Sequence, residues 1–337
     1  MKAVRLHQAL DLRVEEVSSP SSPPAGFVNL EVRAAGICGS DLHNYCTGEW
    51  ISRSPSTAGH EFCGRVSEVG KGVNGFAAGD LVSVDSRVTC GTCPACTSGL
   101  SNVCESMGFV GEACDGGFAQ MVQLPASLLV HHERDLSPRI AAMAEPLAVA
   151  LHAVRRLALP AGEPVLVVGC GAIGGLSALV LSHLHNGPLL LADLNAEKCA
   201  LVSQATGGKT VALDETQISK ALADKRLRYA LDTTGNVIAI EKTLGLLAGG
   251  GALGLVGIGH GTLALDPKKL VEAETSLIGC HAYTDELPEA VRMLPSMAPV
   301  LERFCQVLSS LDDIPKAYNA LLAGEGKTLK TIIEIEE

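Results

Sequence analysis

Aromatic residues are scarce in this chain of 337 residues, where Phe, Tyr and Trp together make up 3%. Hydrophobic cores dominated by aromatic side chains are therefore not expected. Hydrophobic residues still account for 47% of the sequence, and glycine occurs 36 times. Cores rich in Ala, Val, Leu and Gly are typical of closely packed layers of helices and sheets. The length predicts two domains of an α/β protein.

The chain also has no excess of positive charge: it contains 26 Lys and Arg and 37 Asp and Glu, for a formal net charge of −11. No basic run occurs, so nucleic acid and anionic membranes are not expected as partners. The N-terminal segment has no apolar core of a signal peptide, and no stretch of about 18 uncharged apolar residues appears. Together with the clustering of several of the 12 cysteines, this predicts a reducing, cytoplasmic location.

Two kinds of periodicity divide the chain. Residues 1–145 consist mostly of short segments that alternate apolar and polar residues, which predicts a β-rich, barrel-like lobe. From residue 138 to Pro160 the period is helical. Buried strand-like runs then alternate with helical segments, which predicts a parallel, doubly wound sheet. The last 50 or so residues contain one more helix and a final strand.

Four cysteines lie in one short run spaced C-x2-C-x2-C-x7-C, with Gly and Pro between them. This spacing is typical of a closed tetrahedral zinc site with four thiolate ligands. Because such a site leaves no open coordination position, it is structural and not catalytic. Free thiols or two disulfides are the alternatives that the tight spacing disfavours. The ligands are Cys90, Cys93, Cys96 and Cys104.

A glycine-rich motif, G-x-G-x-x-G, follows the apolar run 164–168 and opens a helical segment. This strand–turn–helix context is the one that dinucleotide binding requires. Asp193 ends the next predicted strand, where a carboxylate can accept hydrogen bonds from the adenosine ribose and would repel a 2′-phosphate. The first following cation is Lys198, so NAD is expected rather than NADP. The motif residues are Gly169, Gly171, Ala172, Ile173 and Gly174.

A second set of metal-ligand residues is spread over distant segments: Cys38, His60 with Glu61, and Glu145. A thiolate, an imidazole and a carboxylate suit a zinc that keeps one position open. Each residue also has an ordinary interpretation, as a buried thiol, a turn histidine, or an acid at a helix N-terminus. Spacing alone does not join them into one site.

The motifs occur in a familiar order: GICGSDLH, GHEFCG, the cysteine quartet, DGGFAQ, AEPLAVALHA and GCGAIGG. Together they resemble the zinc-containing medium-chain dehydrogenase/reductase superfamily over nearly the whole chain, and EPLAVA resembles its polyol and threonine dehydrogenase branch. The resemblance implies a second, catalytic zinc, bound by Cys38 and His60. It implies Glu61 as a ligand, and Glu145 as either a ligand or the holder of the zinc-bound water.

The resemblance also implies roles in catalysis and binding. Ser40 and His43 match the pair that carries the substrate proton outward. A plain strand or turn histidine is the less favoured interpretation of His43. The aromatic residues of the pocket segments can equally be packing residues. The residues expected to line the substrate pocket are Tyr45, Trp50, Phe109 and His281. The cofactor is expected to contact the glycine-rich motif, Asp193 and Lys198, and in addition Thr233, Val256, Gly257 and Ile258.

The implied architecture is a Rossmann domain inserted into a β-rich, GroES-like catalytic domain. The expected boundaries are 1–147 for the catalytic domain with its zinc lobe at 88–106, 148–284 for the NAD-binding domain, and 285–337 for the return to the catalytic domain. In relatives the last Rossmann strands pair across a two-fold axis, so a homodimer or homotetramer is expected.

Two positions depart from the polyol dehydrogenase pattern: Ala282 stands where an Arg usually contacts the substrate, and Asn44 where an aromatic residue often follows the relay histidine. The expected reaction is hydride transfer to NAD from a secondary alcohol of a small polyol, sugar alcohol or sugar acid. An amino alcohol such as threonine and a simple diol remain alternatives. A nucleotide-binding protein without turnover is a distant alternative, because every candidate ligand position is filled.

Overall fold

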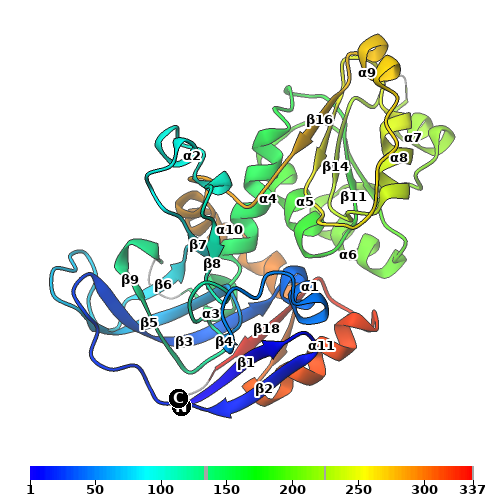
Figure 1. The fold of residues 1–337 in the computed structure, drawn as a ribbon. Helices are drawn as coiled ribbons and strands as arrows, with labels where there is room; N and C mark the ends of the chain where they lie inside the picture. Colours follow the sequence, from blue (N-terminus) through cyan, green and yellow to red (C-terminus); the bar gives the residue numbers. More distant parts are fainter. Residues whose placement is uncertain (133–135, 224, 336–337) are drawn as a thin grey trace. The chain divides into compact units, whose positions relative to one another are not determined.

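The computed structural model describes residues 1–132, 136–223 and 225–335. The chain divides into two compact units, one formed by Met1–Glu145 with Leu287–Glu337 and the other by Pro146–Glu286 (Figure 1). The division lies close to the expected domain boundaries, which themselves stay a prediction. No helix in the described part of the chain combines the length and the apolar character that crossing a membrane requires.

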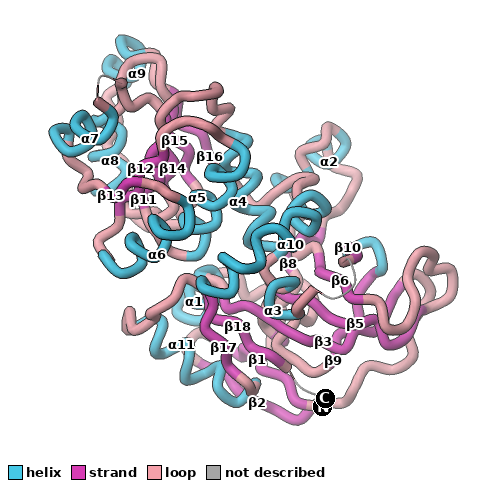
Figure 2. The backbone as a smooth tube through the Cα atoms, turned by 180° about the vertical axis from the view of Figure 1, so that it is seen from behind, coloured by secondary structure: helices cyan, strands magenta, loops and turns pink. Residues whose placement is uncertain are grey.

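The first unit is built on β-sheets, as the alternating pattern of residues 1–145 predicts. One sheet has the order β2-β1-β4, a larger one the order β10-β6-β5-β3-β18-β17 with β9 also paired to β3, and β7 pairs with β8. The strands are drawn in magenta in Figure 2. The strands are β1 (Lys2–Gln8), β2 (Asp11–Glu16), β3 (Phe27–Ile37), β4 (Ser56–Thr57), β5 (Glu61–Val69), β6 (Leu81–Val84), β7 (Arg87–Val88), β8 (Gly108–Phe109), β9 (Met121–Pro125), β10 (Leu129–His131), β17 (Cys305–Leu308) and β18 (Lys330–Glu334).

Strand β18 comes from the far end of the sequence and pairs antiparallel with β3 in the middle of the larger sheet. Apolar side chains of both strands join one buried core with Phe62, Phe118 and Tyr318. The helices of this unit are α1 (Gly39–Thr47), α2 (Pro94–Thr97), α3 (Pro138–Ala141), α10 (Leu287–Phe304) and α11 (Ile314–Leu322), with 3-10 turns η1 (Ser101–Val103), η2 (Ala126–Leu128) and η3 (Leu311–Asp313).

The second unit contains a parallel sheet of order β13-β12-β11-β14-β15-β16, which confirms the predicted doubly wound fold. Strand β11 is buried along its whole length and β12 along all but its first residue, so both consist of continuous apolar residues. The strands are β11 (Val165–Val168), β12 (Leu189–Ala192), β13 (Lys209–Thr210), β14 (Tyr229–Asp232), β15 (Ala252–Leu255) and β16 (Ser276–Gly279); the helices are α5 (Ala172–Leu184), α6 (Ala196–Thr206), α7 (Glu215–Leu222), α8 (Val237–Leu246) and α9 (Pro267–Ala273).

The helical period from residue 138 to Pro160 does not form one helix. It is divided into α3 and α4 (Ala144–Arg156) by a turn at residues 142–143. Helix α4 begins in the first unit and continues in the second. Glu145 consequently lies in the first turn of α4, where the helix dipole favours a carboxylate.

Candidate active site

Cys38 is placed by the short helix α1, which the strand-like reading of residues 1–145 did not predict. The cysteine is the N-cap residue, and its backbone N–H donates to Asp41 Oδ2 at 2.8 Å. The helix ends at Gly48, whose φ of 69° is the left-handed conformation that glycine adopts at little cost. Both helix ends are therefore fixed locally, and Cys38 lies at a defined point after β3.

Cys38, His60 and Glu61 come together in the first unit, with a ligand atom of each within 4.8 Å of the others. Strand β5 begins at Glu61 and pairs with β3, where Glu61 is opposite Gly36, so the sheet register brings the segments together. His60 Nδ1 lies 3.3 Å from Asp41 Oδ1, an arrangement that orients the ring and leaves Nε2 toward the cluster.

The electrostatics of this cluster favour a cation. Burial lowers the pKa of His60, but the negative charges of Asp41 and Cys38 outweigh it and raise this pKa well above its usual value. Thiolate, imidazole and carboxylate are also the donor types that zinc accepts in catalytic sites. The residues present therefore fit a zinc ion with protein ligands from Cys38, His60 and Glu61.

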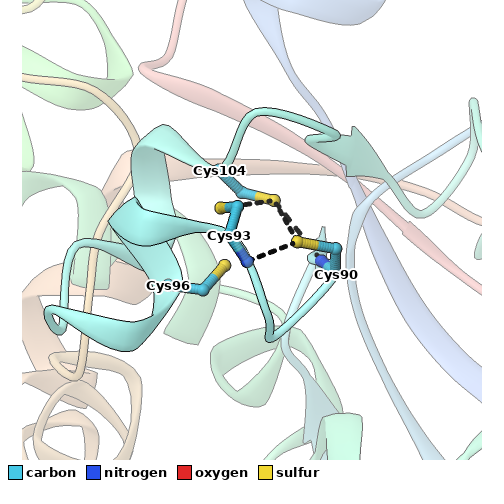
Figure 3. A group of neighbouring side chains, drawn as sticks. All are labelled: Cys90, Cys93, Cys96 and Cys104. Atoms are coloured by element: carbon cyan, nitrogen blue, oxygen red, sulfur yellow. Dashed lines mark hydrogen bonds between the residues drawn. The ribbon is translucent and has the colours of Figure 1, made fainter.

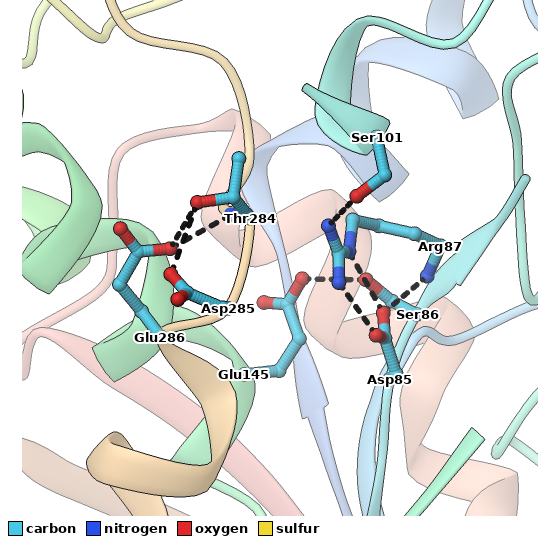
Figure 4. A network of polar contacts seen from close by, with 8 residues as sticks. All are labelled: Asp85, Ser86, Arg87, Ser101, Glu145, Thr284, Asp285 and Glu286. Atoms are coloured by element: carbon cyan, nitrogen blue, oxygen red, sulfur yellow. Dashed lines mark hydrogen bonds and ion pairs between the residues drawn. The ribbon is translucent and has the colours of Figure 1, made fainter. Parts of the chain in front are cut away.

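Glu145 is not part of this close group. Its Oε1 accepts a hydrogen bond of 2.7 Å from Ser86 Oγ, and the carboxyl group is buried (Figure 4). Burial, followed by the charge of Glu61, raises its pKa to about 7, although His60 acts in the opposite direction. The carboxyl therefore lies within electrostatic reach of the cluster. This geometry favours Glu61 over Glu145 as the carboxylate ligand.

Lys330 is a member of the site that the sequence reasoning missed. It lies on β18, is 3% exposed, and forms an ion pair with Glu61, which is 1% exposed. Burial lowers the pKa of Lys330, but Glu61 and Cys38 outweigh burial and raise it. Nothing local in the sequence identified Lys330 or its partner, because the lysine lies between Leu329 and Thr331 in an ordinary strand-like segment.

The proposed relay residues Ser40 and His43 both lie on α1. Ser40 Oγ is 3.4 Å from His60 Nε2, next to the candidate metal ligands. His43 Nε2 is 2.9 Å from Glu49 Oε2, and its ring lies 4.4 Å from that of Trp50. The histidine is therefore on a helix, not in the strand or turn of its ordinary interpretation.

The other expected pocket aromatics have different surroundings. The Phe109 ring lies 6.3 Å from that of His60, close to the candidate metal ligands. Tyr45 packs edge-on against Tyr318 at 5.5 Å and lines the apolar core. The structure thus brings Phe109 next to the metal-ligand cluster, and Tyr45 both packs against Tyr318 and lines a small pocket with His60. Asn44 is buried, and its Oδ1 accepts from the backbone N–H of Trp50 at 2.9 Å.

The cysteine quartet forms a second cluster, with all four sulfur atoms within 4.8 Å of one another (Figure 3). The sulfur of Cys104 lies 3.5 Å from that of Cys90 and 3.9 Å from that of Cys93. Four sulfurs around one zinc at bonds of about 2.3 Å are separated by roughly 3.8 Å. All four cysteines are free of disulfides. The geometry therefore fits a tetrahedral zinc.

Backbone N–H groups donate hydrogen bonds to sulfur atoms of this cluster and thereby stabilise thiolates. Those of Thr92 and Cys93 lower the pKa of Cys90 to about 6, and the N–H of Cys90 donates to Cys104 Sγ at 3.3 Å. Arg87, held by Asp85, donates to Ser101 Oγ at 2.9 Å and fixes the lobe to β7 (Figure 4). Backbone hydrogen bonds also lower the pKa of Cys93, whereas burial raises that of Cys96 to about 12. The protein itself therefore favours the thiolate at Cys90 and Cys93 but not at Cys96.

In the second unit, the carboxyl ends of β11, β12, β14 and β15 meet at one edge of the sheet, as their parallel register requires. The glycine-rich turn lies at this edge. Gly169 has a φ of 93°, and a side chain at Gly174 would overlap the Gly169 carbonyl oxygen. Both positions therefore require glycine. Ala172 and Ile173 form the first turn of α5 after Gly171 as N-cap. The N-terminus of a helix in this position suits an anion such as the phosphate of a dinucleotide.

Asp193 follows β12 at the same edge. Its Oδ2 accepts from the Cys170 N–H at 2.5 Å and its Oδ1 from the Asn195 N–H at 2.6 Å. Both hydrogen bonds hold the carboxylate beside the glycine-rich turn. Lys198, by contrast, lies in the first turn of α6, where its N–H donates to Asn195 Oδ1.

Further expected cofactor residues follow β14 and β15. Thr233 Oγ1 donates to the carbonyl oxygens of Val168 and Gly169, at 3.0 and 3.2 Å. The sequence reasoning missed Asp232, which is fully buried and accepts from Thr234 Oγ1 at 2.6 Å and from the Gly235 N–H at 2.9 Å. These hydrogen bonds fix the loop after β14. The other residues expected at the cofactor, Val256, Gly257 and Ile258, follow β15 and pack against this loop.

His281 is exposed and lies after β16, also in the second unit. The adjoining Ala282 has a φ of 48°, in the left-handed region that non-glycine residues rarely adopt. Glu286 fixes the end of the loop by accepting from the Thr284 N–H at 2.7 Å (Figure 4). His152 Nδ1 lies 3.0 Å from its other oxygen.

Comparison with known proteins agrees with this architecture. Residues 24–134 match the alcohol dehydrogenase GroES-like domain, and residues 172–296 match the zinc-binding dehydrogenase family. The chain is 32% identical to L-galactonate-5-dehydrogenase of Escherichia coli over 76% of each chain. It is 31% identical to a sorbitol dehydrogenase of Halalkalibacterium halodurans over 95% of this chain and 96% of that one.

The fold also matches solved structures. The 2R,3R-butanediol dehydrogenase of Bacillus subtilis superposes with a TM-score of 0.89 over 99% of both chains, at 29% identity. Two family models, the relatives and the fold therefore agree with the order of motifs in the sequence. This chain is an oxidoreductase that belongs to the zinc-containing medium-chain alcohol dehydrogenases.

Proposed function

We propose that this dehydrogenase oxidises a secondary alcohol of a small polyol, sugar alcohol or sugar acid at a zinc held by Cys38, His60 and Glu61, with NAD as the oxidant. The observation that carries the proposal is the convergence of these three side chains within 4.8 Å at a site that favours a cation. A second, structural zinc is assigned to the cysteine quartet. When bound, zinc supplies Lewis-acid polarisation of the alcohol oxygen and NAD accepts the hydride.

The chain itself orients the ligands and moves the proton. Asp41 holds the imidazole of His60, and Ser86 holds Glu145. The hydroxyl of Ser40, 3.4 Å from His60 Nε2, is placed to take the substrate proton. His43, one turn further along α1, is the proposed terminal base, since imidazole exchanges protons near neutral pH. Glu49 and Trp50 fix its ring.

The proposed cofactor is NAD, because Asp193 is held beside the glycine-rich turn. Replacing Asp193 with Ser and Leu194 with Arg should lower the NAD-over-NADP preference by about tenfold or more, since one charge repelling the 2′-phosphate is removed and one attracting it is added. Leu194 is fully exposed, so Arg fits there. The measurement is kcat/KM with each cofactor. Leu194→Arg alone is the matched control, and an unaltered protein equally efficient with both cofactors would refute the role of Asp193.

The substrate class rests on the relatives, which are named for a sugar acid, a polyol and a diol. Ala282 in place of the usual Arg removes a contact to substrate hydroxyls, and this change favours a simple diol as the second candidate. A screen of NAD reduction over polyols, sugar acids, diols and threonine separates the classes. We expect the highest kcat/KM with a polyol or sugar acid; a higher value with threonine or a simple diol would contradict the assignment.

A homodimer or homotetramer, and the cytoplasmic location, stay predictions. Strand β16 ends the order of the parallel sheet within the described residues, and Ile258 and Val271 are 63% and 75% exposed. A sheet edge and apolar side chains of this kind are commonly covered by a second copy. These features support self-association of the second unit.

A further inference from the structure

The ion pair between Lys330 and Glu61 is enclosed by the sheet of the first unit. Both residues are almost fully buried, at 3% and 1% exposure. Gly36 on β3 makes room for them: a methyl group there would lie 2.6 Å from Glu61 Oε2 and 2.9 Å from Lys330 Cε. The register of β3 with β5 and with β18 places Gly36 opposite both Glu61 and Ile332. Three adjacent strands therefore build this contact.

Stability alone does not account for the pair. Removing two charges from water costs about as much as their attraction returns, so a buried ion pair contributes little net stability. Its position is informative instead, because Glu61 faces the metal-ligand cluster and Lys330 at the same time. The Glu61 carboxylate thus contacts the Lys330 ammonium group and also lies at the candidate metal site.

The charges at the site indicate that Lys330 affects how tightly a metal ion would be bound. A zinc ion with the Cys38 thiolate and the Glu61 carboxylate has no net charge, and Lys330 adds one positive charge. Without Lys330, no fixed cation would offset the charge of Glu61, and the carboxylate would give more negative charge to the metal. A more negative ligand binds zinc more tightly and leaves the metal to polarise its substrate less.

We propose that Lys330 is a positioning residue of the catalytic metal site, whose ammonium group holds Glu61 and limits the negative charge that this carboxylate gives to the metal. The inference rests on the proposed function, in which Glu61 faces a bound zinc. Lys330 acts through Glu61, so its influence on the metal depends on the carboxylate at position 61. That dependence makes the proposal testable by a double-mutant cycle.

The test measures the rate at which a colorimetric chelator removes zinc from the unaltered holoprotein, Lys330→Met, Glu61→Gln and the double variant. We expect Lys330→Met to slow the release of the exchangeable zinc about tenfold, since Glu61 is freed to donate more charge. In the Glu61→Gln background the same change should alter the rate by less than about threefold. Lys330→Arg, which keeps the charge, should release zinc close to the unaltered rate.

An equal effect of Lys330→Met in both backgrounds, or none in either, would overturn the inference. If Lys330→Met does not fold, comparison of Glu61→Gln with the double variant still decides, because a large difference between them shows that Lys330 acts without Glu61. A cobalt-substituted protein gives a second readout: its visible absorption bands should shift in Lys330→Met and return in Lys330→Arg. Failure of the proposed function is distinguishable, since Cys38→Ser would then retain the exchangeable zinc.

Discussion

Cys38→Ser should lower kcat by about a thousandfold or more while leaving the protein folded. The serine hydroxyl is a poor zinc ligand in place of a thiolate, so the metal that polarises the alcohol is lost, and that polarisation is worth several kcal/mol of transition-state stabilisation. Cys38 is only partly buried and caps a short helix through its backbone, which serine also does well. The measurement is NADH formation at saturating alcohol and NAD.

Cys46→Ser is the matched control, because Cys46 is an exposed thiol on the same helix and belongs to neither cysteine-containing cluster. It should retain nearly full activity. Circular dichroism and thermal unfolding of both variants separate loss of turnover from loss of fold. Turnover by Cys38→Ser within a few-fold of the unaltered protein would show that the chemistry does not depend on this thiolate.

Cys93→Ser should act on stability instead. A closed zinc site contributes binding free energy directly to folding, and removing one of four ligands should cost about 3 kcal/mol or more. For a protein of this size that corresponds to a fall of roughly 5–10 °C in the unfolding midpoint. The loop that carries Cys93 has few other constraints, since Cys90 is exposed and both Cys93 and Cys96 are partly exposed.

The two cysteine variants should therefore differ in opposite ways in turnover and in thermal stability. Cys93→Ser should keep measurable turnover at low temperature and lose it on warming, whereas Cys38→Ser should be inactive at every temperature and unfold normally. Thermal unfolding in parallel with activity between low and moderate temperature gives both quantities. An unfolding midpoint of Cys93→Ser equal to that of the unaltered protein would mean that the quartet is not a structural metal site.

Features encoded by neighbouring residues were predictable from the sequence. The cysteine quartet spans 15 residues, and the glycine-rich turn follows its strand directly, so spacing alone indicated both sites. The parallel sheet was predictable because strands buried on both faces need continuous apolar residues. Helix α1 was not predicted, because its ends are fixed by a backbone-to-Asp41 hydrogen bond and by Gly48, not by a long apolar period.

Features that depend on distant residues were not predictable. Lys330 meets Glu61 only because β18, at the end of the chain, pairs with β3. The choice between Glu61 and Glu145 needed the structure for the same reason: both are acids in recognisable motifs, but only Glu61 lies within the close cluster. Tyr45, expected at the substrate, packs against Tyr318, a contact between residues 273 positions apart.

The most direct test of a catalytic zinc at Cys38 is metal analysis of the purified protein and of Cys38→Ser, both produced with ample zinc. Two zinc ions per chain are predicted for the unaltered protein, one at each cluster, and one for Cys38→Ser, with the loss of that ion accompanied by the loss of NADH formation. One zinc or none in the unaltered protein, or two in an inactive Cys38→Ser variant, would contradict the account.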